Sequence, residues 1–241
     1  MKPEKSICLA LAVLIRIATL PAHSQPAIIC QHSGFTDPTA EGFSVLTSGS
    51  PSLTPVMADL GHNAWGIGLN SGADIAQYSR SLTPQEKAEA GANGWIMSLT
   101  LRIVPPFSSP TYGMFAQFSM GGKSIAVLFG AENTGDPVVR LGGTYYTVTG
   151  GDSGYHNYEL MYSPQTEIAS LWVDGSYLAE TAGSQTLDTA KFSWGGGQHP
   201  PGSAYANWSD VSLSIIPEPN SASLLWLGAL LSIFLHRRLR P

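Results

Sequence analysis

Residues 112–129, YGMFAQFSMGGKSIAVLF, decide the fold class. In the first half every second side chain is apolar, and after Gly121-Gly122 the alternation resumes from Ile125 to Phe129. A period of two residues is that of a β-strand, and a Gly pair between two such runs is typical of a tight hairpin. The segment therefore predicts two antiparallel strands that share one buried face.

The same period of two residues recurs along most of the chain. The stretch WIMSLTLRI (95–103) places its apolar side chains on one face and Ser98, Thr100 and Arg102 on the other. Further runs of this kind are PVVRLG (137–142), TYYTVT (144–149), YHNYELMY (155–162), IASLWVDG (168–175), SYLAE (176–180), KFSWG (191–195) and NWSDVSLSI (207–215). Many short strands separated by turn residues predict an all-β, two-layer antiparallel sandwich of the jelly-roll kind.

One helix interrupts the strand pattern, in LTPQEKAEAGANG (82–94). Thr83 is placed to cap it, Pro84 suits its first position, and Glu86 completes a capping box. Gly91 or Gly94 would end it. Its polar composition predicts a short surface helix without a chemical role.

The N-terminus has the features of a secretory signal peptide. Lys2 and Lys5 precede a mostly apolar stretch, residues 7–20, and Ala22-His23-Ser24 offers small residues at a cleavage site. We expect signal peptidase to cut after Ser24 and the protein to be exported.

The C-terminus combines three features in a fixed order. Pro217-Glu218-Pro219 comes first, an apolar run follows at residues 222–235, and a basic tail closes the chain with Arg237, Arg238 and Arg240. At about 1.5 Å per residue the apolar run reaches only about 20 Å, short of the roughly 30 Å hydrocarbon core of a membrane.

This order resembles the PEP-CTERM sorting signal of Gram-negative bacteria. The resemblance covers residues 217–241 and implies processing by exosortase, an inner-membrane intermediate, and final placement at the cell surface or in an extracellular biofilm matrix rich in exopolysaccharide. The alternative is a simple tail anchor behind a proline-stiffened linker.

Between these ends, residues 25–216 have the length of one domain. They contain six Lys and Arg against fifteen Asp and Glu, a formal net charge of −9. Nucleic-acid binding is excluded as a main role because it needs a basic surface. Cys30 is the one cysteine of this span, so the domain has no internal disulfide, and an intermolecular bridge or a lipid site stays an alternative to simple packing.

The stretch YHNYELMYSPQTEIASLWVDGSYLAE (155–180), with ANWSDVSLSI (206–215), resembles the laminin-G and concanavalin-A-like jelly-roll group. The resemblance implies a fold that serves lectins, glycosidases and structural modules alike. In this architecture we expect the segment GFTDPTAEGF (34–43) to pair with the last strand.

Catalytic residues are not predicted. A glycosidase of this fold would need a pair of acids alternating on one strand, but Glu159 and Asp210 each stand alone and Asp37 and Glu41 lie in a loop. We therefore expect a non-catalytic glycan-binding or structural module. The alternative is a glycoside hydrolase with an unrecognised carboxylate pair.

No cofactor is predicted, although calcium has candidate ligands. Glu132, Asn133 and Asp136 in AENTGDP, and Asp152 in GGDSG, are oxygen donors in loops. Asn and Asp are also common in such loops for turn geometry alone. His62, His156 and His199 lack the spacing of a zinc site.

Glycan binding would depend on exposed aromatic rings beside polar side chains. The Gly- and Pro-rich segment 194–207 offers such a set, Trp194, His199, Tyr205 and Asn207, and GHNAWG (61–66) offers a second, His62, Asn63 and Trp65. The alternative is that these tryptophans fill the core, which is what we expect of Trp95, Trp172 and Trp208.

Overall fold

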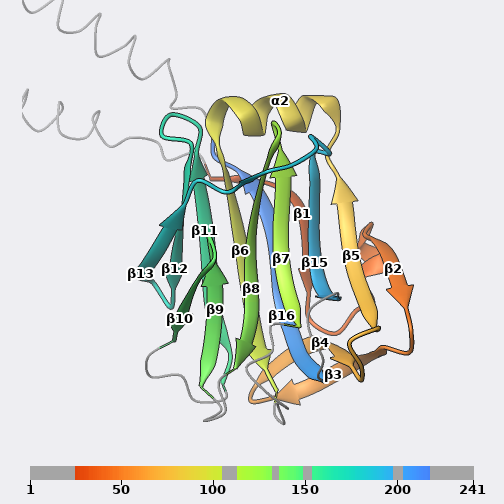
Figure 1. The fold of residues 1–241 in the computed structure, drawn as a ribbon. Coiled ribbons are helices and arrows are strands. Elements are labelled where there is room, and N and C mark those ends of the chain that lie inside the picture. Colours follow the sequence, from red (N-terminus) through yellow and green to blue (C-terminus); the bar gives the residue numbers. More distant parts are fainter. Residues whose placement is uncertain (1–24, 105–112, 132–135, 149–153, 198–202, 218–241) are drawn as a thin grey trace, which may run out of the picture. The chain divides into compact units, whose positions relative to one another are not determined.

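Two antiparallel sheets pack face to face over residues Ala27–Ile216 (Figure 1). The computed structural model describes residues 25–104, 113–131, 136–148, 154–197 and 203–217. Sheet A contains β1 (Ala27–Ser33), β3 (Ser52–Asp59), β4 (His62–Leu69), β6 (Trp95–Ile103), β11 (His156–Ser163), β12 (Ile168–Val173), β13 (Ser176–Thr181) and β16 (Ala204–Ile215). Sheet B contains β2 (Ser44–Ser48), β5 (Ile75–Ser81), β7 (Met114–Met120), β8 (Lys123–Ala131), β9 (Pro137–Leu141), β10 (Thr144–Thr147), β14 (Ser184–Gln185) and β15 (Lys191–Gly197).

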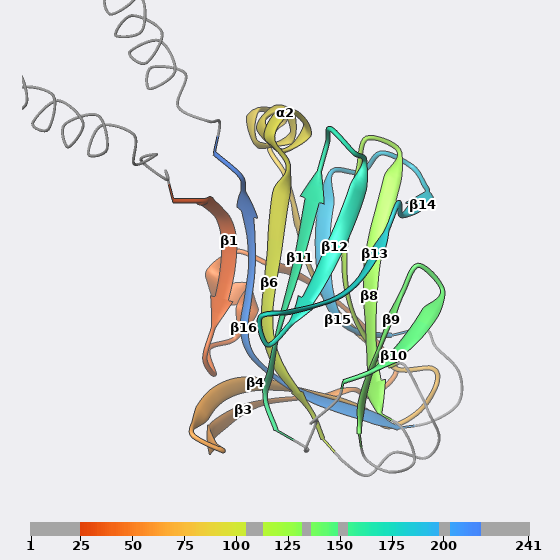
Figure 2. The same ribbon diagram turned by 90° about the vertical axis from the view of Figure 1, so that its left-hand side faces the viewer.

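The predicted hairpin is confirmed as β7 and β8, which pair from Met114 opposite Phe129 to Met120 opposite Lys123. The strand at 95–103 is confirmed as β6, whose side chains alternate strictly between buried and half-buried. The all-β sandwich predicted from the period of two residues is therefore correct. Figure 2 shows the two layers edge-on.

The predicted helix is confirmed as α2 (Pro84–Asn93). The Thr83 hydroxyl accepts from the Glu86 N–H at 3.3 Å, and the Glu86 carboxylate accepts from the Thr83 N–H at 2.8 Å. The helix ends at Gly94, which adopts a positive φ. A short 3-10 helix, η1 (Pro38–Glu41), lies between β1 and β2.

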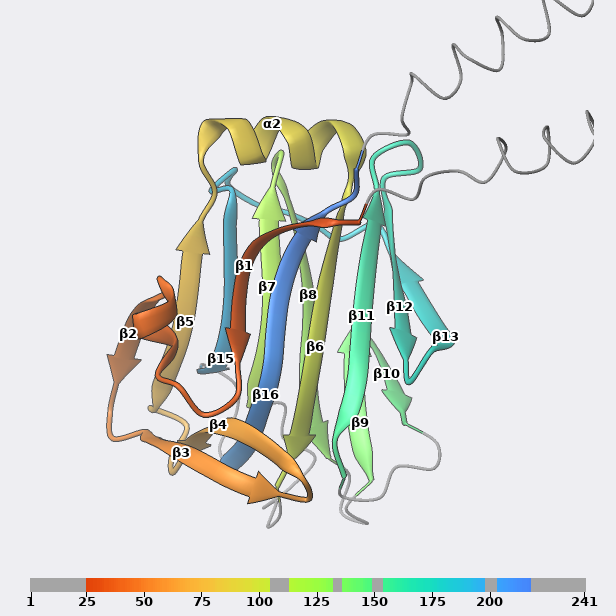
Figure 3. The same ribbon diagram turned by 180° about the vertical axis from the view of Figure 1, so that it is seen from behind.

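The long strand β16 organises sheet A (Figure 3). One of its edges pairs with β6, whereas the other is shared, with β4 along Ala204–Trp208 and β1 along Asp210–Ile215. A bulge at Ser209 separates the two halves. The segment that pairs with the last strand, β16, is thus β1 (Ala27–Ser33). The prediction that residues 34–43 would pair with it is wrong, because they form the turn and η1.

Aromatic rings fill the space between the sheets. Trp194 lies at the centre, with ring centroids 5.0 Å from Tyr78, 5.2 Å from Trp208 and 5.2 Å from His32. Trp95 packs edge-on against Phe118 at 5.0 Å. Trp95 and Trp208 are therefore core residues, as predicted.

The two ends of the chain fall mostly outside the described residues. Residues 1–24 lie outside them, as do Glu218, Pro219 and the run 222–235 with its arginines. Among the residues that are described, no helix is both long and apolar enough to span a membrane. The predictions of a signal peptide and a sorting tail stay predictions.

Candidate functional site

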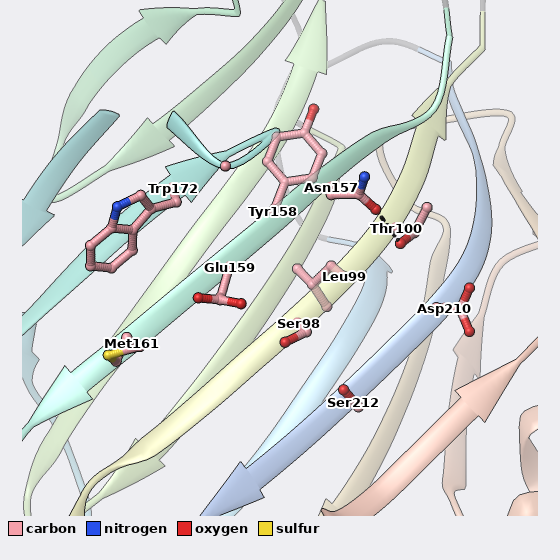
Figure 4. Close-up of a pocket in the computed structure, with 11 residues that line it drawn as sticks. Ser98, Leu99, Thr100, Asn157, Tyr158, Glu159, Met161, Trp172, Asp210 and Ser212 are labelled. Atoms are coloured by element: carbon pink, nitrogen blue, oxygen red, sulfur yellow. Dashed lines mark hydrogen bonds between the residues drawn. The ribbon is translucent and has the colours of Figure 1, made fainter. Parts of the chain in front are cut away.

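A shallow pocket of about 400 Å³ lies on the outer face of sheet A, turned away from sheet B (Figure 4). Its side chains come from four neighbouring strands, β12, β11, β6 and β16. Those that point outward into it are Trp172, Asn157, Glu159, Met161, Ser98, Thr100, Asp210 and Ser212. Outward residues recur at every second position because side chains of a strand alternate between the two faces.

Strand register sets these side chains in two rows. In the first row Trp172 lies opposite Glu159, Glu159 opposite Ser98, and Ser98 opposite Ser212. Directly opposite residues in antiparallel strands have Cβ atoms about 4.5–5.5 Å apart. An aromatic ring, a carboxylate and two hydroxyls are thus neighbours across the sheet.

The second row is polar throughout. Asn157 lies opposite Thr100, and Thr100 opposite Asp210. The Thr100 hydroxyl donates to the Asn157 carbonyl oxygen at 2.8 Å, which leaves the amide NH2 of Asn157 as a donor. Asp210 accepts from the Ser209 hydroxyl at 3.3 Å.

Trp172 is a member of the pocket, so its predicted core position is wrong. Along β12 the inward residues are Ala169, Leu171 and Val173, and Trp172 is half-buried on the outer face. Its ring meets Tyr177 edge-on, with centroids 5.8 Å apart. Tyr177 is exposed, so the pair lies at the surface, and Trp172 is the member that lines the pocket.

Trp194, predicted as a binding residue, is instead buried in the core. The strand predicted at residues 191–195 is confirmed as β15, which continues to Gly197 into the segment predicted to be a Gly- and Pro-rich loop, and Trp194 on this strand is 0% exposed. The strand forms because glycine allows neighbouring backbones to approach: a Cβ on Gly195 would lie 2.2 Å from the Ala76 carbonyl oxygen. Trp194 therefore cannot stack on a ligand. Trp65, also offered as a binding residue, is in the core and donates to the Tyr78 hydroxyl at 2.9 Å.

Three other predicted binding residues do share the outer face of sheet A. Tyr205 lies over Gly66 and Gly68, where an added Cβ would come within 2.8 Å of its hydroxyl and 2.6 Å of its ring. Asn207 and His62 lie beside it on β16 and β4. Asn63 is exposed and accepts from the Ala58 N–H at 3.1 Å, and His199 lies outside the described residues.

Asp59, the last residue of β3, accepts the hydrogen bonds of a polar network next to the pocket. Its carboxylate accepts from Arg102 at 2.5 Å, from Asn207 at 2.6 Å and from the Tyr155 hydroxyl at 3.0 Å. Partial burial alone would raise the pKa of Asp59, but these three hydrogen bonds outweigh it and lower the pKa.

Tyr155 links this network to His62. The two rings stack with centroids 4.2 Å apart. Burial raises the pKa of the Tyr155 hydroxyl, and its hydrogen bond to Asp59 adds to the effect. The phenol therefore stays a neutral donor at ordinary pH, and the network is fixed in place.

The acids judged to stand alone in the sequence are brought together. Glu159 on β11 and Asp210 on β16 project from the same face, with β6 between them. Two strand spacings and two residues along the strand put their Cα atoms about 12 Å apart. They are 51 positions apart in the sequence and lie on different strands, so a search for acids that alternate along one strand could not find them.

The predicted calcium ligands lie mostly outside the described residues, which include Asp136 but not Glu132, Asn133 or Asp152. Among described residues no group of three His, Cys, Asp or Glu side chains could hold a metal ion. The calcium prediction is therefore untested. Cys30 is buried, and its pKa is raised to about 12 by burial, so it is an unreactive thiol.

No known family model matches the sequence, and no curated protein does. Among solved structures, a carbohydrate esterase of Shiga toxin-encoding bacteriophage phi24B is similar, with a TM-score of 0.61, 9% identity, and coverage of 80% of this chain and 100% of the other. The binding domain of botulinum neurotoxin serotype D/C has a TM-score of 0.50 and 12% identity over 84% of this chain. This chain spans about half of that domain, 52%.

Similarity at these identities concerns the fold. It agrees with the jelly-roll sandwich of the concanavalin-A-like type that the sequence predicts. Folds of this type carry both enzymes and binding modules, so the site has to decide the function.

Proposed function

We propose that this protein is an exported, non-catalytic module that binds glycans on the outer face of sheet A. The observation that carries the proposal is Trp172, a half-buried ring beside Glu159, Asn157 and Ser98 in an open pocket. A sugar presents an apolar face and a polar rim, which match a ring flanked by hydroxyl, amide and carboxylate groups.

The shape of the site supports a glycan over a compact small molecule. The pocket lies on an open sheet face, and Asp59 and Tyr205 lie on strands of the same sheet, outside the pocket lining. A shallow polar surface with few rings gives weak binding, because only a few contacts offset the ordering of ligand and side chains. One protein of the same fold is a carbohydrate esterase, which is consistent with such a ligand.

Binding of soluble polysaccharides by wild type and Trp172→Ala tests the proposal. We expect the substitution to weaken binding roughly tenfold or more, since aromatic anchors dominate such sites. Tyr145→Ala is the matched control, because Tyr145 is also an exposed aromatic residue but lies on β10 of sheet B. Equal binding by Trp172→Ala and wild type would place the site elsewhere.

Glycoside hydrolysis is the second candidate, favoured by the shared face of Glu159 and Asp210. Retaining glycosidases hold their carboxyl groups about 5–5.5 Å apart and inverting ones about 6.5–9.5 Å. A Cα separation of about 12 Å reaches the inverting range only if both side chains lean toward each other. Release of reducing sugar by wild type, abolished in Glu159→Gln, would favour this alternative over a binding module.

Export and sorting complete the proposal. Signal peptidase would remove the signal peptide. Pro217-Glu218-Pro219, with the apolar run and the arginines, would hold the chain in the inner membrane for processing by exosortase, after which the protein would reach the cell surface or the matrix. Intact mass of protein from a native host tests this. A mature protein that begins after Ser24 and lacks residues 222–241 is expected; a retained tail in the inner membrane would indicate a tail anchor.

A further inference from the structure

The charged side chains that line the pocket are all of one sign. Its lining includes two carboxylates, Glu159 and Asp210, and no Lys, Arg or His. In the described part of the chain neither carboxylate has an ion-pair partner, and Glu159 is exposed. A ligand in this pocket therefore meets negative potential that no lining group offsets.

The cations of the domain are placed elsewhere. All six Lys and Arg of residues 25–216 lie in described positions, so no gap in the described ranges adds another. Arg80, Lys87 and Lys123 pair with Glu86, Asp188 and Glu167. None of these three cations lines the pocket, and of the remaining three, Arg140 and Lys191 lie on sheet B.

Arg102 is the one cation on the same face. It follows Thr100 by two positions on β6, but its guanidinium is held by Asp59 at 2.5 Å. Because Asp59 has a lowered pKa, the pair stays ionised and its charges cancel locally. Arg102 thus does not balance Glu159 and Asp210.

The row that contains Trp172 gives the negative charge a defined place. A sugar ring stacked on Trp172 would put its rim next to Glu159, the residue directly opposite on β11. Beyond Glu159 come the Ser98 and Ser212 hydroxyls, and Asp210 lies in the next row. Glu159 is therefore within reach of the sugar stacked on Trp172, and Asp210 is within reach of the next sugar of the glycan.

We infer that the pocket selects glycans that carry free amino groups over uncharged and acidic ones. This rests on the proposed function, which it narrows to a ligand class. An ammonium group on the sugar would pair with Glu159, whereas a uronate would be repelled by both carboxylates. N-acetylation removes the cation and leaves only the stacking and hydroxyl contacts.

The test compares three hexasaccharides on the full-length protein, purified in a non-ionic detergent without a sugar headgroup. The probes are a glucosamine hexamer, its fully N-acetylated counterpart and a galacturonate hexamer. We expect the glucosamine hexamer to bind tightest and the galacturonate hexamer weakest. Glu159→Gln should weaken glucosamine binding about two- to fivefold, since exposed ion pairs are worth little each, and should weaken binding of the N-acetylated hexamer less, because the Gln amide still hydrogen-bonds to hydroxyls.

General attraction to an acidic protein is the main rival explanation. Glu89→Gln on α2 removes the same charge from an exposed site away from the pocket and is the matched control. Binding of a lysine hexamer, which is cationic but contains no sugar, should not depend on Trp172. If Glu89→Gln weakens glucosamine binding as much as Glu159→Gln does, the inference is wrong.

The outcomes separate the inference from the proposed function. If the N-acetylated hexamer binds as tightly as the glucosamine hexamer and both depend on Trp172, the preference for amines is wrong and the glycan site remains. If no hexamer shows binding that depends on Trp172, both fail. Tighter binding of the amine, reduced by Glu159→Gln and by added salt, supports the inference.

Discussion

Trp172 and Trp194 occupy similar sequence settings but opposite environments. Each lies on a strand of alternating residues followed by glycine, SLWVDG and FSWGGG. Trp194 on β15 is 0% exposed and contacts rings from both sheets, whereas Trp172 on β12 is half-buried and faces solvent over the pocket. A tryptophan on a strand thus says little about function until the inward face of that strand is known.

The partners of each strand account for the difference. β15 lies within sheet B between β5 and β7, and its outward neighbours are glycines and serine, so its large ring has to point inward. β12 lies next to the edge strand β13 and already sends Ala169, Leu171 and Val173 inward. The core is complete without Trp172, which leaves the ring available to a ligand.

Removing the ring of Trp194 should have the largest effect on stability. We expect Trp194→Ala to lower the free energy of unfolding by about 3–5 kcal/mol, because it leaves a cavity among Tyr78, Trp208 and Phe43. Urea unfolding, monitored by circular dichroism, measures the change in the free energy of unfolding. A loss below about 1 kcal/mol would mean that Trp194 is not the centre of the core.

The glycine after Trp194 should be almost as sensitive. Gly195 has φ +125°, and an added Cβ would lie 2.2 Å from the Ala76 carbonyl oxygen. Gly195→Ala should therefore cost about 2–4 kcal/mol from backbone strain and overpacking.

Gly91→Ala is the control for that substitution. Gly91 lies in α2 with open space around its Cα, so alanine there should stabilise the protein by about 0.5–1 kcal/mol. If Gly195→Ala leaves the urea midpoint unchanged or raises it, as Gly91→Ala is expected to do, β15 is not packed as closely as its geometry indicates.

Local patterns predicted the elements well. The hairpin of β7 and β8, the alternation of β6 and the capping box of α2 each follow from residues close in sequence. Such features depend on dihedral preferences and side-chain period, which a single sequence displays.

The pocket could not be predicted in the same way. Its main row joins Trp172, Glu159, Ser98 and Ser212, which only strand pairing between distant segments brings together. The glycine run of β15 misled in the other direction, because glycine occurs both in loops and where backbones approach closely. Tyr205, Asn207 and His62 were predicted as binding residues from composition alone; they lie on the face that holds the pocket but do not line it, and their role stays a prediction.

Acid should weaken the network next to the pocket. The pKa of Asp59 is lowered in the folded protein, so its contribution is present above the unfolded pKa of about 4 and is lost as pH falls through the folded value. Asp59→Asn should cost about 1–3 kcal/mol at neutral pH, since Arg102, Tyr155 and Asn207 lose a charged acceptor.

The pH profile distinguishes this effect from simple loss of packing. The cost of Asp59→Asn should shrink from neutral pH to a pH below the lowered pKa of Asp59, where wild type also loses the carboxylate charge. Urea unfolding at both pH values measures it. A cost that is the same at both would assign the effect to shape and not to charge.

Removing the ring of Trp172 should have the smallest effect on stability and the largest on binding. We expect Trp172→Ala to change the free energy of unfolding by about 1 kcal/mol or less, because the ring contacts Tyr177 at the surface and leaves no internal cavity. Trp172→Phe, which keeps an aromatic face, should retain most of the glycan binding that Trp172→Ala loses. Urea unfolding and polysaccharide titration on the same three proteins decide the matter. A destabilisation by Trp172→Ala as large as that by Trp194→Ala would restore Trp172 to the core and remove the ring on which the proposed site depends.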